Sequence, residues 1–159
     1  MRKTNNNIVI ILSLLAVLSS SCGRNTLYSD TVKMPGVKWS MYDPGKFACH
    51  INDTTGSFNI SFSVRTSTEY PYRNLYMFIV TTFPSGSSMT DTLQGRLATP
   101  EGKWLGKGAG DIREITIPYK SNVFFPESGE YHFKVIHGMR DTTLEGVYDI
   151  GMKIAKRTK

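Results

Sequence analysis

Three histidines are the side chains of this sequence best suited to proton transfer or metal binding: His50, His132 and His137. Side chains on a strand alternate between its two faces, so His132 and His137, five residues apart, would point to opposite faces. They lack the two-residue spacing that lets one strand present two ligands on the same side. Zinc sites also use cysteine or acidic ligands at defined spacings, a pattern that does not accompany these histidines. We expect partly buried strand histidines and no metal site.

Other groups that can catalyse reactions are no better assembled. Cys49 would need a basic partner to lower its pKa, and on a strand the adjacent His50 points away from it. The segment 106–111 is glycine-rich, but it lacks the spacing of a phosphate-binding loop and no helical pattern follows it. We expect its glycines to supply positive φ angles in a tight loop or in bulges. Asp111 and His132 remain as the best acid–base pair, and we predict no enzymatic activity and no cofactor.

Cys22 is the residue whose surroundings indicate a definite chemistry. Arg2 and Lys3 precede a nearly unbroken apolar run over residues 8–18, and three serines then lead into the cysteine. A charged start, an apolar stretch and a small-residue cleavage site make up a removable export signal. The apolar run is 11 residues long, whereas a helix needs roughly 20 to span a bilayer. We therefore expect residues 1–21 to be a signal peptide that is cleaved off.

A cysteine directly after the small residues resembles the lipobox of bacterial lipoproteins. The resemblance implies that the Cys22 thiol carries a diacylglycerol, that the signal is cut before Cys22, and that the new N-terminus is acylated. Leu18 stands four residues before the cysteine, whereas the commonest lipobox has it three residues before. The alternative is an ordinary secretory signal with an unrelated cysteine near its end. Lipidation predicts a stable membrane anchor, because several acyl chains together hold a protein on a bilayer.

Chain length, net charge and the number of cysteines limit the class of protein to which this chain can belong. The mature chain from Cys22 onward has 138 residues, the size of one domain. The whole sequence has 19 basic and 13 acidic residues, and loss of Arg2 and Lys3 with the signal lowers the formal charge from +6 to about +4. A surplus this small does not indicate nucleic-acid binding. With Cys22 lipidated, Cys49 has no partner for a disulfide, so apolar burial must hold the domain together.

Two parts are expected after the signal. Residues 22–57 are rich in Gly, Pro, Asn, Ser, Thr and Asp, with turn signals at 35–36, 43–45 and 52–53. We predict a lipidated N-terminus, a tether and an irregular entry segment there, with one short strand around residues 46–51. Residues 58–159 are predicted to form the folded domain.

Strand patterns dominate residues 58–159. Apolar and polar residues alternate over 58–65, which predicts a strand with one buried face. Residues 75–83 are dense in aromatic and β-branched side chains and predict a central strand buried on both faces. A turn at 84–87 makes 89–97 the hairpin partner of that strand.

Later segments are also strand-like. Pro118 and Pro126 predict that the strands between residues 112 and 125 are short or lie at an edge. Alternation over 131–135 and a closing segment over 147–155 predict two more strands, the last with Gly151 as a bulge. Outside the signal, no apolar period typical of a helix persists for three turns. The sequence therefore predicts an all-β fold, a single β-sandwich of the immunoglobulin-like or jelly-roll type.

Asp-Thr pairs begin at residues 30, 53, 91 and 141, each followed by an apolar residue or a second threonine. They resemble the O-glycosylation sequence Asp-Thr/Ser-apolar of exported Bacteroidota proteins. Turn chemistry is an equal alternative, because Asp and Thr side chains commonly bond to nearby backbone groups.

Several blocks of the chain are distinctive. The most specific are Tyr-Pro-Tyr at 70–72 and Trp-Leu-Gly-x-Gly-x-Gly-Asp at 104–111; the others are 90–93, 125–131 and 146–154. In this order they resemble the gliding-motility lipoprotein H (GldH) family of Bacteroidota, over nearly the whole mature chain. The resemblance implies a membrane-anchored accessory of the gliding and type 9 secretion apparatus, with other envelope proteins as partners and with no catalytic residues.

An interaction protein is the first functional hypothesis, because the chain combines an anchor with one domain that lacks assembled catalytic groups. A periplasmic module that binds glycan or peptidoglycan by stacking sugars on aromatic rings is the alternative. The candidate contact residues are Trp104, Tyr70, Tyr72 and Trp39, with Tyr119 added for a glycan. For Trp104, a role as a core plug is the competing interpretation.

Charge near the two ends of the mature chain bears on location. Surface-exposed Bacteroidota lipoproteins resemble one another in having acidic residues soon after the cysteine, whereas the first acid here is Asp30. We predict an outer-membrane lipoprotein that faces the periplasm.

A basic cluster lies near the C-terminus at Lys153, Lys156, Arg157 and Lys159. It is predicted to be a solvated tail, with a binding patch as the alternative.

Overall fold

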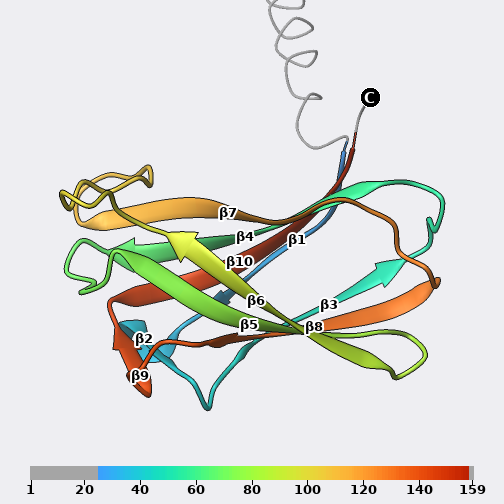
Figure 1. Ribbon diagram of the computed structural model, residues 1–159, viewed down its shortest axis with the longest axis horizontal. Coiled ribbons are helices and arrows are strands. Elements are labelled where there is room, and N and C mark those ends of the chain that lie inside the picture. The colour runs from blue at the N-terminus through green and yellow to red at the C-terminus, as the bar shows by residue number, and fades with distance from the viewer. Residues whose placement is uncertain (1–24, 158–159) are drawn as a thin grey trace, which may run out of the picture.

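The structure is a computed structural model that describes residues 25–157 (Figure 1). Cys22 and the predicted signal peptide lie outside the described residues. Within them, no helix is long and apolar enough to cross a membrane. The elements are β1 (Thr26–Lys33), the 3-10 turn η1 (Pro35–Val37), β2 (Lys38–Ser40), β3 (Gly45–Ile51), β4 (Phe58–Ser67), β5 (Asn74–Thr82), β6 (Ser88–Arg96), β7 (Ile112–Val123), β8 (Gly129–His137), β9 (Thr143–Glu145) and β10 (Val147–Lys156).

Two four-stranded antiparallel sheets make up the molecule, and the all-β sandwich prediction is confirmed. The first sheet has the order β1-β10-β4-β7 and the second the order β3-β8-β5-β6. A small third sheet, β2-β9, lies below one end of the first sheet in Figure 1. Asp91 of β6 links the two large sheets along one side of the sandwich. Its carboxylate accepts hydrogen bonds from the Tyr119 hydroxyl and the Lys120 Nζ of β7.

The core fills the space between the two large sheets. Phe58, Ile60, Phe62 and Val64 alternate along β4 and are all buried, as their period of two predicts. The second sheet contributes the same pattern from β5 and β8, including Met77, Ile79, Phe133 and Val135. Each of these side chains contributes about 1.5–3 kcal/mol by leaving water, which is how a domain without an internal disulfide is held together.

The hairpin prediction is also confirmed. β5 and β6 pair in register from Asn74–Arg96 to Thr82–Ser88, around the turn at 84–87. The prediction that β5 is buried on both faces is wrong, since Tyr76 and Phe78 are exposed. In a two-layer sandwich the outer face of an antiparallel sheet meets solvent even at a central strand.

β7 agrees with its prediction, whereas β10 differs in detail. β7 is an edge strand, one of the two forms expected for this segment, and it is 12 residues long. Pro118 fits there because β7 pairs on one side only, and the register shifts next to its partner Ser61. Gly151 is not a bulge, because β10 keeps its register there with both neighbours and shifts instead between Val147 and Asp149. A side chain at Gly151 would collide with the Ser63 hydroxyl of β4.

The predicted boundary at residue 57 is wrong for the described part of residues 22–57. β1 pairs along β10 from Thr26 to Lys33, and β3 pairs with β8 over its full length. The short strand expected around 46–51 is confirmed as β3. The turn residues that suggested a tether connect strands of the same domain, so the folded domain begins at β1.

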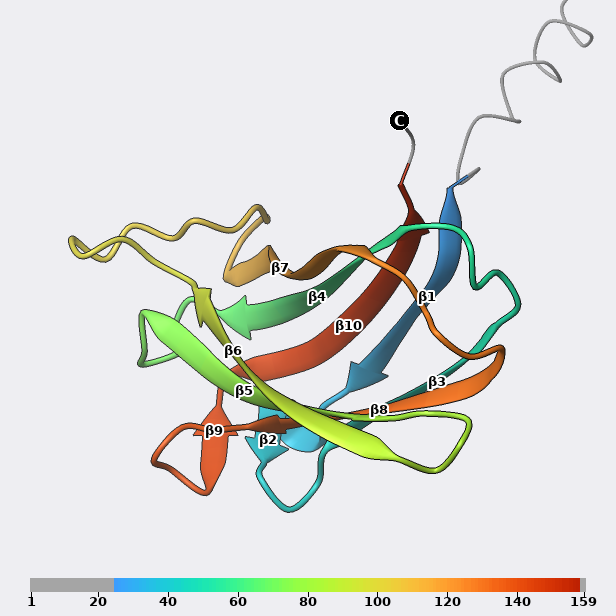
Figure 2. The same ribbon diagram turned by 45° about the vertical axis from the view of Figure 1, so that its right-hand side comes forward.

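The strands place the loops at two ends of the sandwich. At the entry end, the chain begins beside the end of β10, where Lys156 N donates to Asn25 O at 2.7 Å, and loops 52–57, 83–87 and 124–128 connect strands. At the far end lie loops 41–44, 68–73, 97–111 and 138–142 with β2 and β9. Figure 2 shows loop 97–111 extending to the left, while β1 begins and β10 ends at the upper right.

Candidate functional site: the loops at the far end

Loops 68–73 and 97–111, which carry the two distinctive sequence blocks, are bonded to each other. Arg73 O accepts hydrogen bonds from Leu97 N at 2.8 Å and Ala98 N at 3.1 Å, and Arg73 Nη1 donates to Pro100 O at 2.7 Å. Thr68 N donates to Asp111 O at 2.7 Å. The two blocks therefore form one continuous surface, although they are far apart in sequence.

The Tyr-Pro-Tyr block connects this surface to the interior. Tyr70 is buried, and its ring meets the Tyr72 ring edge-on with 5.7 Å between centroids. The hydroxyl of Tyr72 donates a hydrogen bond to the Asp141 carboxylate of loop 138–142, and this bond raises the pKa of Tyr72. Tyr70 is thus a core residue, which makes its prediction as a contact residue wrong. Tyr72 remains half-exposed and ties a third loop to the other two.

Two glycines of segment 106–111 allow the loop backbone to lie close to the backbone of β7. Lys107 and Glu114 exchange backbone hydrogen bonds of 2.8 and 2.7 Å, so loop 97–111 folds back along β7 as a ribbon. A Cβ at Gly106 would lie 2.5 Å from Glu114 O, and one at Gly108 would overlap Ile112 O. The expected positive φ holds only for Gly110, at 60°. The loop leads directly into β7, so the expected lack of a following helix agrees with the strand seen there.

The same loop carries the aromatic residue of the second block. Trp104 forms an isolated bridge with Ala98 and is half-buried against the core. It therefore acts partly as the core plug that was its competing interpretation, while the residue stays partly accessible to solvent. The next residue, Leu105, is 48% exposed.

Trp39 has a purely structural position, and its prediction as a contact residue is wrong. Its side chain is 0% exposed and meets the His137 ring edge-on at 5.3 Å. Trp39 Nε1 and both ring nitrogens of His137 are buried without a hydrogen-bond partner. Burial lowers the pKa of His137 below its usual value.

His137 is expected to make the fold less stable in acid. Because its pKa is lower in the folded chain than in the unfolded one, the unfolded chain binds the proton more tightly. The free energy of unfolding should therefore fall as the pH drops below about 6.5. Urea midpoints of the wild type and of His137→Gln at pH 7.5 and 5.5 test this. The variant should lose less stability between the two pH values, whereas His132→Asn, at an exposed site, should behave as the wild type. An unchanged pH dependence in His137→Gln would contradict the assignment.

The remaining groups with potential chemistry lie apart. Burial, with a smaller effect of Glu130, raises the pKa of the buried Cys49 thiol to about 11, which keeps it uncharged. Asp111 lies at the far end, whereas His132, opposite Thr82 and 3.7 Å from the Glu130 carboxylate, lies toward the entry end. Among residues 25–157, no three His, Cys, Asp or Glu side chains are grouped as metal ligands.

Tyr42 is an exposed far-end residue that sequence reasoning missed. Its side chain is 81% exposed, and a hydrogen bond of 2.9 Å from Met41 N to Thr142 O places its loop beside loop 138–142. The available signal was an aromatic residue immediately before the Asp43-Pro44-Gly45 turn. We call Tyr42, Tyr72, Trp104 and Leu105 the far-end surface.

Comparison with known proteins identifies the family. Residues 26–154 match the family model described as GldH lipoprotein. The chain belongs to the GldH lipoprotein family. The match runs from the first residue of β1 to within two residues of the end of β10, so the family resemblance of the sequence is confirmed over the whole described fold.

Two curated GldH relatives are similar over almost their whole lengths. The gliding motility lipoprotein GldH homolog of Christiangramia forsetii is 32% identical, covering 93% of this chain and 94% of the relative. Gliding motility lipoprotein GldH of Flavobacterium johnsoniae is 30% identical, covering 92% of this chain and 95% of the relative. The chain is therefore a gliding-motility lipoprotein, lipid-anchored in the cell envelope.

Solved structures give a fainter likeness. The K1 cleaved adhesin domain of Lys-gingipain from Porphyromonas gingivalis aligns with a TM-score of 0.35 at 9% identity, covering 82% of this chain and 83% of that domain. A likeness this faint transfers nothing about the function of the GldH chain.

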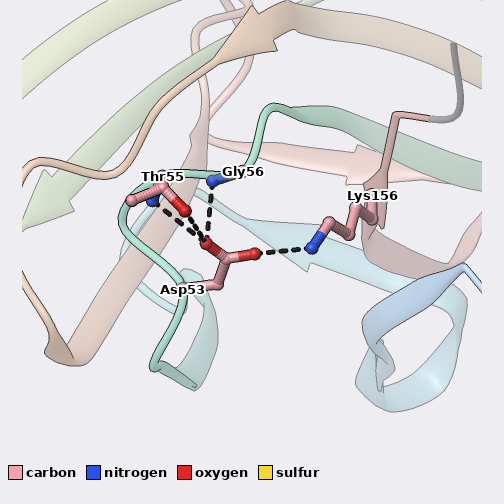
Figure 3. A network of polar contacts seen from close by, with 4 residues as sticks. All are labelled: Asp53, Thr55, Gly56 and Lys156. Atoms are coloured by element: carbon pink, nitrogen blue, oxygen red, sulfur yellow. Dashed lines mark hydrogen bonds and ion pairs between the residues drawn. The ribbon is translucent and has the colours of Figure 1, made fainter.

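The Asp-Thr pairs of this GldH chain have local structural roles. Asp53 Oδ1 accepts hydrogen bonds from Thr55 N, Thr55 Oγ1 and Gly56 N, and Asp53 Oδ2 binds Lys156 Nζ at 2.6 Å (Figure 3). Lys156, followed by these donors, holds the pKa of Asp53 well below its usual range. Turn chemistry thus accounts for this pair. Thr54 itself is exposed, so its glycosylation stays an open prediction.

Proposed function

We propose that this GldH-family lipoprotein is a non-enzymatic accessory of the gliding motility and type 9 secretion machinery, which binds other envelope proteins through the far-end surface. One observation carries the proposal: the blocks 70–72 and 104–111 meet at the end opposite the chain entry, where Leu105 is exposed, and exposed Tyr42 lies on loop 41–44, which is bonded to loop 138–142 at the same end. Exposed aromatic and apolar side chains on a supported surface are typical of protein interfaces.

The proposed location is the outer membrane, with the domain in the periplasm. The support is the absence of acidic residues between Cys22 and Asp30 in the sequence. Strands of nine to ten residues such as β4 and β5 separate the two ends by about 30 Å at 3.3 Å per residue. A lipid on Cys22 would therefore hold the entry end at the membrane and present the far end to partners.

The non-enzymatic role is supported by the separation of the reactive groups. Asp111 and His132 lie toward opposite ends of the sandwich, and the raised pKa of Cys49 makes it a poor nucleophile. The far-end surface instead consists of groups that recognise a partner by shape and apolar contact.

The glycan-binding alternative loses support from its own residues. Trp39 is fully buried, and the half-buried Tyr119 is tied to Asp91 on the side of the sandwich. Trp104 and Tyr72 remain as rings able to stack, and both are half-buried. A protein partner is therefore the better proposal.

Charge substitutions on the far-end surface test the proposed function in a species that glides. The doubly substituted Tyr42→Asp, Leu105→Asp protein should abolish colony spreading and reduce secretion of a type 9 cargo, because charges introduced into an apolar interface oppose association. Both side chains are exposed, so the folded protein should accumulate to normal levels in membranes, as an immunoblot would record.

Thr90→Asp is the matched control. It also adds a charge at an exposed site, but on β6 outside the far-end surface, and both functions should persist. Normal spreading and secretion in the doubly substituted strain, with normal protein levels, would overturn the proposal.

A further inference from the structure

We propose that the entry end of the sandwich is a second membrane contact, in which the exposed side chain of Phe124 lies in the lipid headgroup layer. The inference rests on the lipid anchor of the proposed function. The partner of this surface is the bilayer in which the lipid anchor is inserted. This choice is supported by the position at which the chain enters the domain.

The anchor leaves the entry end little freedom. Only three residue steps separate Cys22 from Asn25, which span at most about 11 Å when fully extended. Asn25 is already tied to the domain, because its carbonyl accepts a hydrogen bond of 2.7 Å from Lys156 N. A lipidated Cys22 therefore keeps the start of β1 within about 11 Å of the headgroups, a distance of about two strand spacings.

Phe124 lies at this same level of the molecule. Thr26 of β1 pairs with Ala155 of β10, Lys156 of β10 pairs with Phe58 of β4, and Phe58 pairs with Val123 at the end of β7. Adjacent strands are about 4.8 Å apart, so Phe124 lies about 15 Å from the start of β1 along the sheet edge. A flat surface that touches one can touch the other.

The exposure of Phe124 is imposed by its neighbour. Phe125 is buried and packs edge-on against Phe58 at 5.4 Å and Tyr131 at 4.9 Å. Because consecutive side chains of an extended chain point to opposite sides, burial of Phe125 turns Phe124 outward. The Phe124 side chain is 58% exposed, and an aromatic ring held in water next to a bilayer gains by entering its interface.

The charges around the chain entry suit this contact. Arg157 is exposed and its backbone N–H is held by Ser57 O at 2.8 Å, while Lys156 is engaged with Asp53. Arg157 forms none of the ion pairs found among residues 25–157. A free guanidinium beside the anchor can bind the phosphate of a lipid headgroup. The basic C-terminal cluster would then be a membrane contact rather than a solvated tail.

Quenching by brominated lipid tests the proposal on the full lipidated protein. Phe124→Trp protein is reconstituted into phosphatidylcholine/phosphatidylglycerol vesicles, with and without bromine on the acyl chains. The emission contributed by Trp39 and Trp104 is measured on the wild type and subtracted. The emission added by the substitution should fall to roughly half in brominated vesicles if the ring lies in the interface. Leu105→Trp, at the exposed far end, is the control and should keep its emission.

Flotation of the vesicles separates the two proposals. Protein that floats with the vesicles while Phe124→Trp is quenched no more than Leu105→Trp would overturn the membrane contact and leave the anchor intact. Protein that does not float would overturn both. Quenching of Phe124→Trp alone, in floating vesicles, supports the contact.

Discussion

Replacing Trp39 with alanine is expected to lower the free energy of unfolding by about 3–5 kcal/mol, the range typical of removing a buried Trp or Phe side chain. Trp39 is 0% exposed and packs against His137. Its strand β2 pairs only with β9, and Trp39 is the one residue of β2 that is buried. The cavity left by the missing ring would therefore destabilise the far end, in addition to the stability lost with the buried apolar area.

Urea unfolding of the purified full chain measures this effect. Trp104→Ala is the matched control, because it removes the same atoms from a half-buried site, and it should cost less. If Trp39 served as a contact residue, Trp39→Ala would leave stability nearly unchanged and impair binding. A loss of less than about 1 kcal/mol, typical of a surface substitution, would contradict the structural role.

Replacing Cys22 with serine is expected to remove nearly all of the protein from the membrane fraction. Serine has no thiol to form the thioether to diacylglycerol, and a protein without acyl chains has no stable hold on a bilayer. Fractionation and intact-mass measurement of the exported chain would record the loss of both the anchor and the lipid mass.

Cys49→Ala is the control for this prediction. Cys49 is buried in β3 and free, so its replacement should leave the chain lipidated and in membranes. Retention of Cys22→Ser in the membrane fraction, with unchanged mass, would show that the chain is held in another way and that the lipobox interpretation is wrong.

Strands with a buried face could be predicted from this sequence because their side chains alternate. The period of two over 58–65 directly reflects the core contacts of β4, and the turn at 84–87 identified the β5–β6 hairpin. β1 could not be predicted in this way, since an edge strand with five of its eight residues exposed carries almost no apolar period. Its partner lies at the opposite end of the sequence, where local patterns give no information.

The far-end surface was harder to predict than the fold. Sequence reasoning located the blocks around Tyr70 and Trp104 and expected aromatic contacts, but it did not distinguish rings that face the core from rings that face solvent. Tyr70 and Trp39 are buried, whereas Tyr42, outside both blocks, is the most exposed large apolar side chain of the described residues. Burial depends on which loops pack over a ring, and that follows from long-range pairing.

The pairing of β1 with β10 also governs when the domain can fold. β10 lies between β1 and β4 in the first sheet, so the opening strand of the domain has no neighbour until the last strand is available. Almost the whole domain must therefore be available before its first sheet can close. Folding dominated by such distant contacts is slow, and β1 and β4 expose unpaired edges in the interval. The two ends of the sequence thus have to meet before the edge of β1 is covered.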